Sequence, residues 1–230
     1  MYLFWRLLLS HLLADFPFQT DAVYRLKARS GWGVVLHGTI AGVTGFALCG
    51  PYLSHPLTWA LCSSLWIFHI ILDAAKLRLS TGLHRWNASL FVLDQVLHVG
   101  SLALAAWLGA GLPKEGIDIW LYGSDRFVQH ACAYLAATYG TLFLVMSVEI
   151  PTGRQVSLPS RGRRWIGYAE RAAVLTLVRL GGTFILLLIG YVILRITIGL
   201  RGRWPDPTPW WGQIFGLVVA VSLGMALSFL

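Results

Sequence analysis

Long apolar segments restrict what this chain can fold into more than any other feature of its sequence. About 20 consecutive apolar residues are needed to cross the hydrocarbon core of a bilayer as a helix. Six segments meet or approach this length: Trp32–Leu53, Leu57–Ala75, Ser89–Leu112, Phe127–Ile150, Ala172–Ile198 and Trp210–Leu230. A seventh, Tyr2–Phe16, is shorter and ends before Pro17, so we expect a short or re-entrant helix there. The sequence therefore predicts an all-α fold, a polytopic transmembrane helix bundle with six to seven membrane helices.

The composition supports a membrane protein. Hydrophobic residues make up 57% of the 230 residues and charged residues only 12%, whereas soluble domains carry roughly 25% charged residues. The abundance of apolar residues also excludes a disordered chain. The net charge is +8, but the 18 Lys and Arg residues fall mainly in short clusters between apolar segments. That pattern is typical of topology signals and of contacts with anionic lipid headgroups, so membrane lipids, and no nucleic acid, are the expected partners.

Basic residues in the connecting segments predict the orientation, because cytoplasmic loops are enriched in Lys and Arg. If the first segment crosses fully, ten basic residues fall on one side: Arg25, Lys27, Arg29, Lys76, Arg78, Arg85, Arg154, Arg161, Arg163 and Arg164. That side is predicted to be cytoplasmic. Arg201 and Arg203 fall on the opposite side and conflict with this orientation locally. Residues 1–112, with four segments, and residues 113–230, with three, are expected to form one domain.

Ionisable residues inside the apolar segments form pairs with helical spacing. Three His–Asp pairs are each separated by four residues: His11 and Asp15, His69 and Asp73, and Asp94 and His98. Residues four apart lie on one face of a helix. Lys76 joins the face of Asp73, and His37 lies near the start of its segment. Because successive segments cross in alternate directions, all these residues are predicted to lie at one level near the cytoplasmic face. The same level is predicted for Glu149, Glu170 and Arg171.

Four histidines and three aspartates in one pocket suit a divalent transition metal, Zn²⁺ first, with Mn²⁺ or Fe as alternatives, and one ion or two. The candidate ligands are His11, Asp15, His37, His69, Asp73, Asp94 and His98. An aspartate one turn from a histidine can instead accept its ring N–H and fix its tautomer. The candidate catalytic residues are Asp15 or Asp94 as general base and Lys76 as the cation that neutralises a phosphate or an oxyanion, a role also open to Arg171.

The leading interpretation is a metal-dependent hydrolase with its site at the cytoplasmic leaflet, acting on a lipid or a phosphorylated amphiphile. A cation or proton transporter would use the same cluster as a relay. It predicts polar residues continuing to the far face, for which the candidates are Thr39, Thr44, Ser63 and Ser64. An accessory subunit of a larger membrane complex, in which the His–Asp pairs only hold the bundle together, predicts that these residues can be replaced without loss of assembly. Membrane-protein partners or a homo-oligomer also stay open.

The order and spacing of the polar residues carry a resemblance to a known family. The residues concerned are His11-Leu-Leu-Ala-Asp15-Phe16, Gln19-Thr20-Asp21, His37, His69-Ile-Ile-Leu-Asp73 with Lys76, and Asp94-Gln95-Val-Leu-His98. They resemble the bacterial membrane family catalogued as domain of unknown function 3307 (DUF3307), which implies a multi-pass protein of the bacterial cytoplasmic (inner) membrane and no particular activity. Gly167-Tyr-Ala-Glu170-Arg171 is similar to a looser motif of longer members, with Arg195 where a lysine is expected. A weaker likeness, to membrane-bound metal-dependent hydrolases, is analogy alone.

Overall fold

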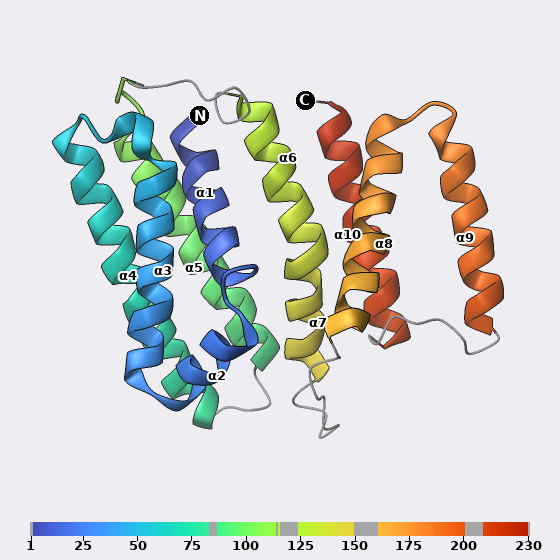
Figure 1. Cartoon of the computed structure of the whole chain (residues 1–230), viewed down its shortest axis with the longest axis horizontal. Helices are drawn as coiled ribbons and strands as arrows, with labels where there is room; N and C mark the ends of the chain where they lie inside the picture. Colours follow the sequence, from blue (N-terminus) through green and yellow to red (C-terminus); the bar gives the residue numbers. More distant parts are fainter. Residues whose placement is uncertain are drawn as a thin grey trace. The chain divides into compact units, whose positions relative to one another are not determined.

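Helices make up the regular structure of the described residues. A computed structural model describes residues 2–82, 87–113, 115, 124–149, 161–200 and 209–229. The helices are α1 (Tyr2–Asp15), α2 (Asp21–Arg29), α3 (Gly31–Leu48), α4 (Pro56–Gly82), α5 (Asn87–Leu108), α6 (Asp125–Leu135), α7 (Thr141–Glu149), α8 (Arg161–Leu180), α9 (Phe184–Leu200) and α10 (Trp210–Ser228) (Figure 1). A 3₁₀ turn, Gly50–Tyr52, precedes α4, and a π-helical turn, Ala136–Gly140, joins α6 to α7. The predicted all-α class is confirmed.

Five helices are long and apolar enough to cross a membrane: Gly31–Leu48, Pro56–Ser80, Ala88–Leu108, Asp125–Glu149 and Trp210–Ser228. Large apolar side chains on these helices point outward, and Trp107, for example, is 72% exposed. Apolar surfaces of this extent are rare on soluble monomers, so the chain is a membrane protein. With 14 residues, α1 extends about 21 Å, less than the roughly 30 Å hydrocarbon core. This agrees with the short first helix that the sequence predicts.

The predicted single span over Ala172–Ile198 is wrong. The structure has two helices there, α8 and α9, which run in opposite directions (Figure 1). The chain turns at Gly181 and Gly182, whose φ angles are 60° and 55°, a left-handed conformation that favours glycine. The apolar run continues through this turn, so hydropathy alone does not detect it. α9 is a shorter apolar helix, with Phe184–Ile198 as its apolar part.

This antiparallel pair also changes the orientation argument for the last helices. Arg201 and Arg203 lie outside the described residues, in the segment that joins α9 to α10. Because α8 and α9 are antiparallel, α9 ends and α10 begins where α8 begins, with Arg161 (Figure 1). The conflict of Arg201 and Arg203 with the predicted orientation depended on one crossing over Ala172–Ile198. The hairpin removes that assumption, and the orientation itself stays a prediction.

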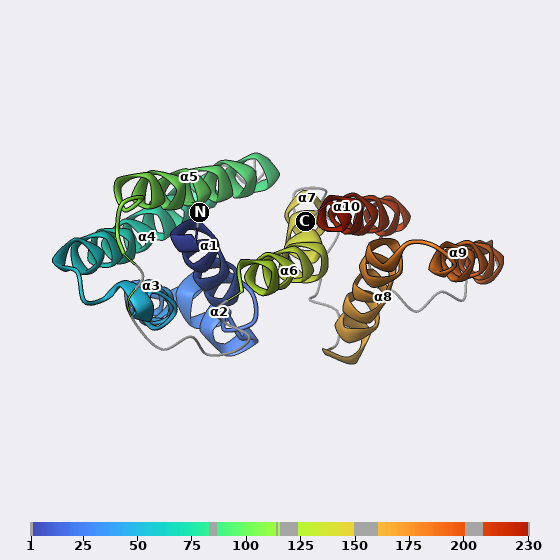
Figure 2. The same cartoon turned by 90° about the horizontal axis from the view of Figure 1, so that it is seen from above.

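The described chain forms two compact units, Met1–Cys132 and Ala133–Leu230, and the expectation of one domain stays a prediction. In the first unit α1 lies beside α3, α5 and the start of α6, and α4 packs against both α3 and α5 (Figure 2). An apolar core is formed by Leu3, Leu7, Cys49, Tyr52, Cys62, Leu102 and Ala105. Leu3 and Leu7 lie early in α1, Cys62 in the first half of α4, Leu102 and Ala105 late in α5, and Cys49 and Tyr52 in the turn that follows α3. The predicted His and Asp ligands of the same four helices lie toward their other ends.

Glycines on α3 let two helices of the first unit approach closely. A Cβ added at Gly38 would lie 2.2 Å from Cγ1 of Ile70, and one added at Gly42 would lie 2.6 Å from another α4 side chain. Small residues four apart are typical of closely packed membrane helices. Gly38 follows His37 and Ile70 follows His69. The close helix contact therefore sets the distance between the two histidines.

The second unit is organised around α10. Small residues spaced four apart are buried along this helix: Gly212, Gly216, Ala220 and Gly224. Polar side chains join α9 to α8 and α10, because Arg195 lies 2.8 Å from a carboxylate oxygen of Glu170 and donates to Oε1 of Gln213 at 3.1 Å. The Trp211 indole donates to Glu149 at 2.8 Å. That Glu149 and Glu170 share one level with the His and Asp residues of the first unit stays a prediction.

Candidate metal centre

Four helices bring the predicted ligands together at the polar end of the first unit. They are His11 and Asp15 from α1, His37 from α3, His69 and Asp73 from α4, and Asp94 and His98 from α5. These residues are between 0% and 9% exposed. Buried carboxylates are unfavourable unless they are paired or bind a cation, so the partners of each oxygen and nitrogen decide what the cluster can do.

Asp15, His37 and His69 each offer one candidate ligand atom, and the three atoms form a close triangle. We call these three residues the first group. Nε2 of His37 lies 3.3 Å from Nε2 of His69 and 3.3 Å from Oδ1 of Asp15. The third side, from Nε2 of His69 to Oδ1 of Asp15, is 3.5 Å. A tetrahedral ion with bonds of about 2.0–2.1 Å to nitrogen and oxygen has ligand atoms about 3.3–3.4 Å apart. The triangle therefore has the size of one face of a tetrahedral metal site.

Asp73 lies beside the first group and is paired with Lys27. In the sequence this lysine stands out only as one of the basic residues that predict the membrane orientation. Its Oδ2 lies 3.5 Å from Nε2 of His37 and 3.4 Å from Nε2 of His69. Its Oδ1 lies 2.7 Å from Nζ of Lys27. Asp73 can thus offer one oxygen to an ion while Lys27 neutralises the other.

Lys27 belongs to α2, a nine-residue helix that a search for apolar segments misses. The Thr20 side chain caps this helix by accepting a hydrogen bond from the amide of Val23. Asp21 lies in the first turn and Arg29 in the last, an arrangement that suits the helix dipole. These capping and charge signals were present in the sequence, and they were sufficient to indicate a short polar helix.

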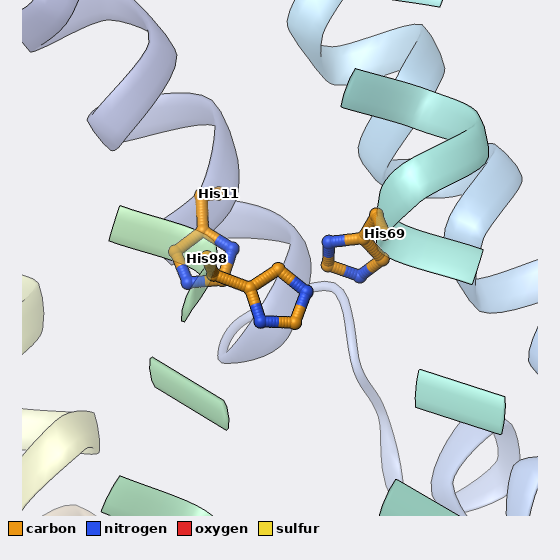
Figure 3. A group of neighbouring side chains, drawn as sticks. All are labelled: His11, His69 and His98. Atoms are coloured by element: carbon orange, nitrogen blue, oxygen red, sulfur yellow. The ribbon is translucent and has the colours of Figure 1, made fainter. Parts of the chain in front are cut away.

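His11, His69 and His98 form the second group, in which each residue offers a ligand atom within 4.8 Å of the others. Figure 3 shows the three rings close together and turned toward one another. The ring centroid of His98 lies 4.9 Å from that of His11, in a stacked arrangement, and 4.5 Å from that of His69. His69 belongs to both groups, so the two groups are neighbours in one pocket.

Gln95 is a site residue whose role the sequence did not reveal. Its amide nitrogen donates to Oδ2 of Asp94 at 3.2 Å and to Oδ2 of Asp15 at 3.4 Å. Its amide oxygen lies 3.3 Å from Nε2 of His11. Gln95 stands inside the motif Asp94-Gln95-Val-Leu-His98, but its spacing does not distinguish it from a surface residue. Its contacts with α1 arise only where α1 meets α5.

Lys76 reaches from the rim of the cluster to a buried carboxylate. Its Nζ donates to Oδ2 of Asp94 at 2.7 Å, and the Lys76 side chain is 30% exposed. Oδ1 of Asp94 is buried and accepts no hydrogen bond from the residues that the structure describes. Asp73 and Asp94 both lie outside the two groups of three described ligand residues. Oδ2 of Asp73 lies 3.4–3.5 Å from Nε2 of two histidines, whereas Oδ1 of Asp94 lies 3.6 Å from Nδ1 of His98. The catalytic roles of Asp15, Asp94 and Lys76 stay predictions.

The unpaired polar atoms of the cluster fit a bound cation. Within the described ranges, Oδ1 of Asp15 and Oδ2 of Asp73 are buried and have no hydrogen-bond donor. They are the same oxygens that face the histidine nitrogens of the first group. Burying a carboxylate oxygen without a donor is unfavourable. Imidazole and carboxylate are donors that Zn²⁺, Mn²⁺ and Fe accept, so these groups could hold a metal ion.

Comparison with known proteins supports the resemblance that these residues carry. Residues 3–127 match the family described as a protein of unknown function, DUF3307. No curated protein and no solved structure matches the chain. The matched region covers more than half of the 230 residues and contains both groups of candidate ligands, together with Lys27, Lys76 and Gln95. The chain belongs to the DUF3307 family.

Proposed function

We propose that this protein is a metal-dependent hydrolase of the bacterial cytoplasmic membrane, with its site at the cytoplasmic leaflet and a lipid or phosphorylated amphiphile as substrate. The first group is the observation that carries the proposal, because its three buried ligand atoms lie 3.3–3.5 Å apart. Zn²⁺ is the expected ion, since imidazole and carboxylate ligands suit it. When bound, it would supply a Lewis acid and a water that loses its proton near neutral pH.

Asp94 is the residue we assign as general base. Lys76 and Gln95 both donate to its Oδ2, which holds the carboxylate in one orientation. Its Oδ1 is left without a donor among the described residues. A base held in place with one open oxygen can take a proton from a water beside it. Asp15, the other candidate base, lies within 3.8 Å of nitrogens of both groups, which favours its use as a ligand.

The charges of the cluster support an anionic substrate. The carboxylates of Asp15, Asp73 and Asp94 carry −3, and Lys27 and Lys76 carry +2. With neutral histidines and one divalent ion, the total becomes +1. Lys76 at the rim is close enough to the solvent to contact an anionic group, as an anion-binding residue must be. A phosphate or a developing oxyanion would therefore meet a positive potential at the loaded site.

Helix α2 supports a substrate that arrives from the membrane surface. None of its residues is buried, and Tyr24 on this helix and Trp32 just beyond it are exposed. Arg25 adds an exposed positive charge. Exposed aromatic and basic side chains on an amphipathic helix are typical of binding at the level of lipid headgroups. Lys27 of the same helix contacts Asp73, so a headgroup bound at α2 would lie beside the site.

A transporter receives less support from the same residues. Two of the four hydroxyls that a polar path to the far face would use, those of Thr39 and Thr44, donate to carbonyl oxygens of their own helix. Beyond the His and Asp residues lies the apolar core around Leu7 and Leu102, and the buried Arg6 beside it is paired with Asp125 at 2.8 Å. Moving an ion through such a core is unfavourable.

Metal analysis of the purified protein tests the metal site. We expect about one equivalent of Zn²⁺ or more in the wild type, and a loss of about one equivalent in His69→Ala, because Nε2 of His69 is one of the three ligand atoms of the first group. His130→Ala is the matched control, since His130 lies on α6 outside both groups and contacts the Arg126 carbonyl. Less than about a tenth of an equivalent in the wild type, unchanged by His69→Ala, would contradict the proposal and favour a structural cluster.

Hydrolysis of a lipid phosphate in detergent micelles tests the activity. We expect the zinc-loaded protein to release inorganic phosphate. Asp94→Asn should lower the rate by about 10²–10⁴ without changing the metal content. If the loaded protein hydrolyses neither lipid phosphates nor lipid acyl esters, the hydrolase assignment is wrong. Co-purification with fixed partners would then favour an accessory subunit.

A further inference from the structure

We propose that the same pocket holds a second metal ion, bound by His11 and His98, which shares the Asp15 carboxylate with the first ion. This inference rests on the proposed metal site of the first group and extends it from one ion to two. It follows from the direction in which the buried imidazole nitrogens present their lone pairs.

His98 presents Nε2 as the nitrogen with the lone pair. Its Nδ1 lies 2.8 Å from the carbonyl oxygen of Asp94. A carbonyl oxygen can only accept, so Nδ1 carries the proton and donates it. Nε2 is then unprotonated in the neutral ring, and it is buried without a hydrogen-bond partner among the described residues. Fixing the tautomer through the other ring nitrogen is what partners of metal-binding histidines do.

His11 presents Nδ1 in the same state, because Gln95 sets its tautomer. The Gln95 amide nitrogen faces the carboxylates of Asp15 and Asp94, and only an N–H₂ group can donate to both of them. The amide oxygen must then face Nε2 of His11, at 3.3 Å, so Nε2 carries the proton. The remaining nitrogen, Nδ1, is buried and accepts no hydrogen bond from the described part of the chain.

Two buried, unprotonated nitrogens therefore lie on neighbouring rings. His11 is 4% exposed and His98 is 3% exposed, and their rings are stacked with centroids 4.9 Å apart. A purely structural cluster would be expected to pair these nitrogens with donors, since an unmet buried acceptor is unfavourable. Lone pairs held open in this way are available to a metal ion, and neutral imidazole is the commonest protein ligand for one.

Asp15 connects this pair to the first group. Its Oδ1 lies 3.3 Å from Nε2 of His37 in the first group and 3.8 Å from Nδ1 of His11 in the second. Its Oδ2 accepts from Gln95 at 3.4 Å. Oδ1 itself is buried and lacks a donor among the residues described. The carboxylate is therefore placed between the two sets of nitrogens, which is the position of a bridging ligand.

One ion does not account for both groups. The ligand atoms of the described residues divide into two sets of mutually close atoms, and only His69 is common to them. Nε2 of His69 lies within 3.5 Å of the Asp15 and His37 atoms of the first group, so we assign His69 to the first ion. The second ion then takes His11 and His98, and it shares Asp15, whose Oδ1 lies 3.8 Å from Nδ1 of His11. Its remaining positions stay open for water or substrate.

A pair of ions narrows the substrate class to phosphate esters. Two-metal centres, with ions about 3.5–4 Å apart, stabilise both the attacking and the leaving oxygen of an in-line displacement at phosphorus. The two ions would raise the formal charge of the cluster from the +1 expected with one ion to +3, because the carboxylates and lysines are unchanged. An anionic phosphate group suits this charge better than a neutral acyl ester.

Metal stoichiometry of the full-length protein, freed of metal and titrated with Zn²⁺ in detergent, tests the inference. We expect about two equivalents in the wild type, about one in His98→Ala and about one in His37→Ala. His130→Ala, which alters a histidine outside both groups, should keep two. One equivalent in the wild type, or two in His98→Ala, would refute the second site and leave the first intact. No metal at all would refute the proposed function as well.

Electron paramagnetic resonance of the wild type loaded with Mn²⁺ tests the same point without any substitution. Two Mn²⁺ ions bridged by Asp15 should give an exchange-coupled spectrum once about two equivalents are added. A spectrum of isolated ions at every loading would contradict the shared carboxylate. This measurement keeps the inference testable if His98→Ala does not fold.

Discussion

His37 on α3 and His69 on α4 present Nε2 atoms to each other at 3.3 Å, although 32 residues separate them in the chain. The distance follows from the contact one residue further along each helix, where the Ile70 side chain packs against Gly38. A candidate ligand pair in this protein thus depends on a residue that has no side chain. The geometry of the candidate metal site therefore depends on how closely α3 and α4 pack.

Gly38→Ala should separate the two histidines. A Cβ at this position would lie 2.2 Å from Cγ1 of Ile70, so the Ile70 side chain must be displaced or α3 and α4 must move apart, at a cost typical of overpacking, about 1–3 kcal/mol. We expect lower zinc content and a lower unfolding temperature in detergent. Gly100→Ala on α5, where a Cβ would meet nothing within 4 Å, is the control and should retain metal. If adding Ile70→Ala to Gly38→Ala restores no zinc, the contact is not what sets the distance.

Lys27→Met should destabilise the metal-free protein more than the loaded one. Lys27 pairs at 2.7 Å with Asp73, whose side chain is only 2% exposed. Removing one partner of a buried ion pair leaves an uncompensated charge, at a cost of about 3–5 kcal/mol. A bound ion would supply the missing positive charge. Thermal unfolding with and without Zn²⁺ measures the difference, with the exposed Arg25→Met on the same helix as control. An equal loss in both states would argue against metal binding at Asp73.

Gln95→Leu should weaken metal binding without removing any ligand. The substitution deletes the acceptor for Nε2 of His11 and the donor to Asp15 and Asp94. Loss of such an orienting partner typically lowers metal affinity by about 10–100-fold. Competition with a chromogenic chelator measures the change, and Gln129→Leu on α6 serves as the matched control. Unchanged affinity would show that the His11 tautomer does not depend on Gln95.

Much of the candidate site was predictable because its His and Asp residues are spaced one helical turn apart. His11 and Asp15, and likewise Asp94 and His98, are one turn apart, and charged residues are scarce in this chain. Gln95 and Lys27 were not predictable in the same way. Gln95 contacts α1 from α5, and Lys27 contacts α4 from a short amphipathic helix that has no long apolar segment. Such contacts depend on how the helices pack against each other, which the spacing of residues along one helix does not predict.

The fold was predictable where apolar length alone defines a helix, and not where the backbone turns inside an apolar run. Trp32–Leu53 and Ser89–Leu112 each match an observed helix, α3 and α5, to within a few residues. Ala172–Ile198 has the same apolar character, but it contains Gly181 and Gly182 in a left-handed conformation. Hydropathy is a property of side chains, so it does not register a turn made by two residues that lack them.

Gly182→Ala should therefore test the hairpin between α8 and α9. A Cβ at Gly182 would meet no atom within 4 Å, so the expected cost comes from the positive φ of 55° alone, about 1–2 kcal/mol. Gly190→Ala, in the interior of α9 and equally uncrowded, should instead stabilise the protein by about 0.5–1 kcal/mol, because glycine is unfavourable within a helix. Thermal unfolding of both variants in one detergent gives the comparison. Stabilisation by both substitutions would mean that the segment forms one continuous helix, as its hydropathy alone predicts.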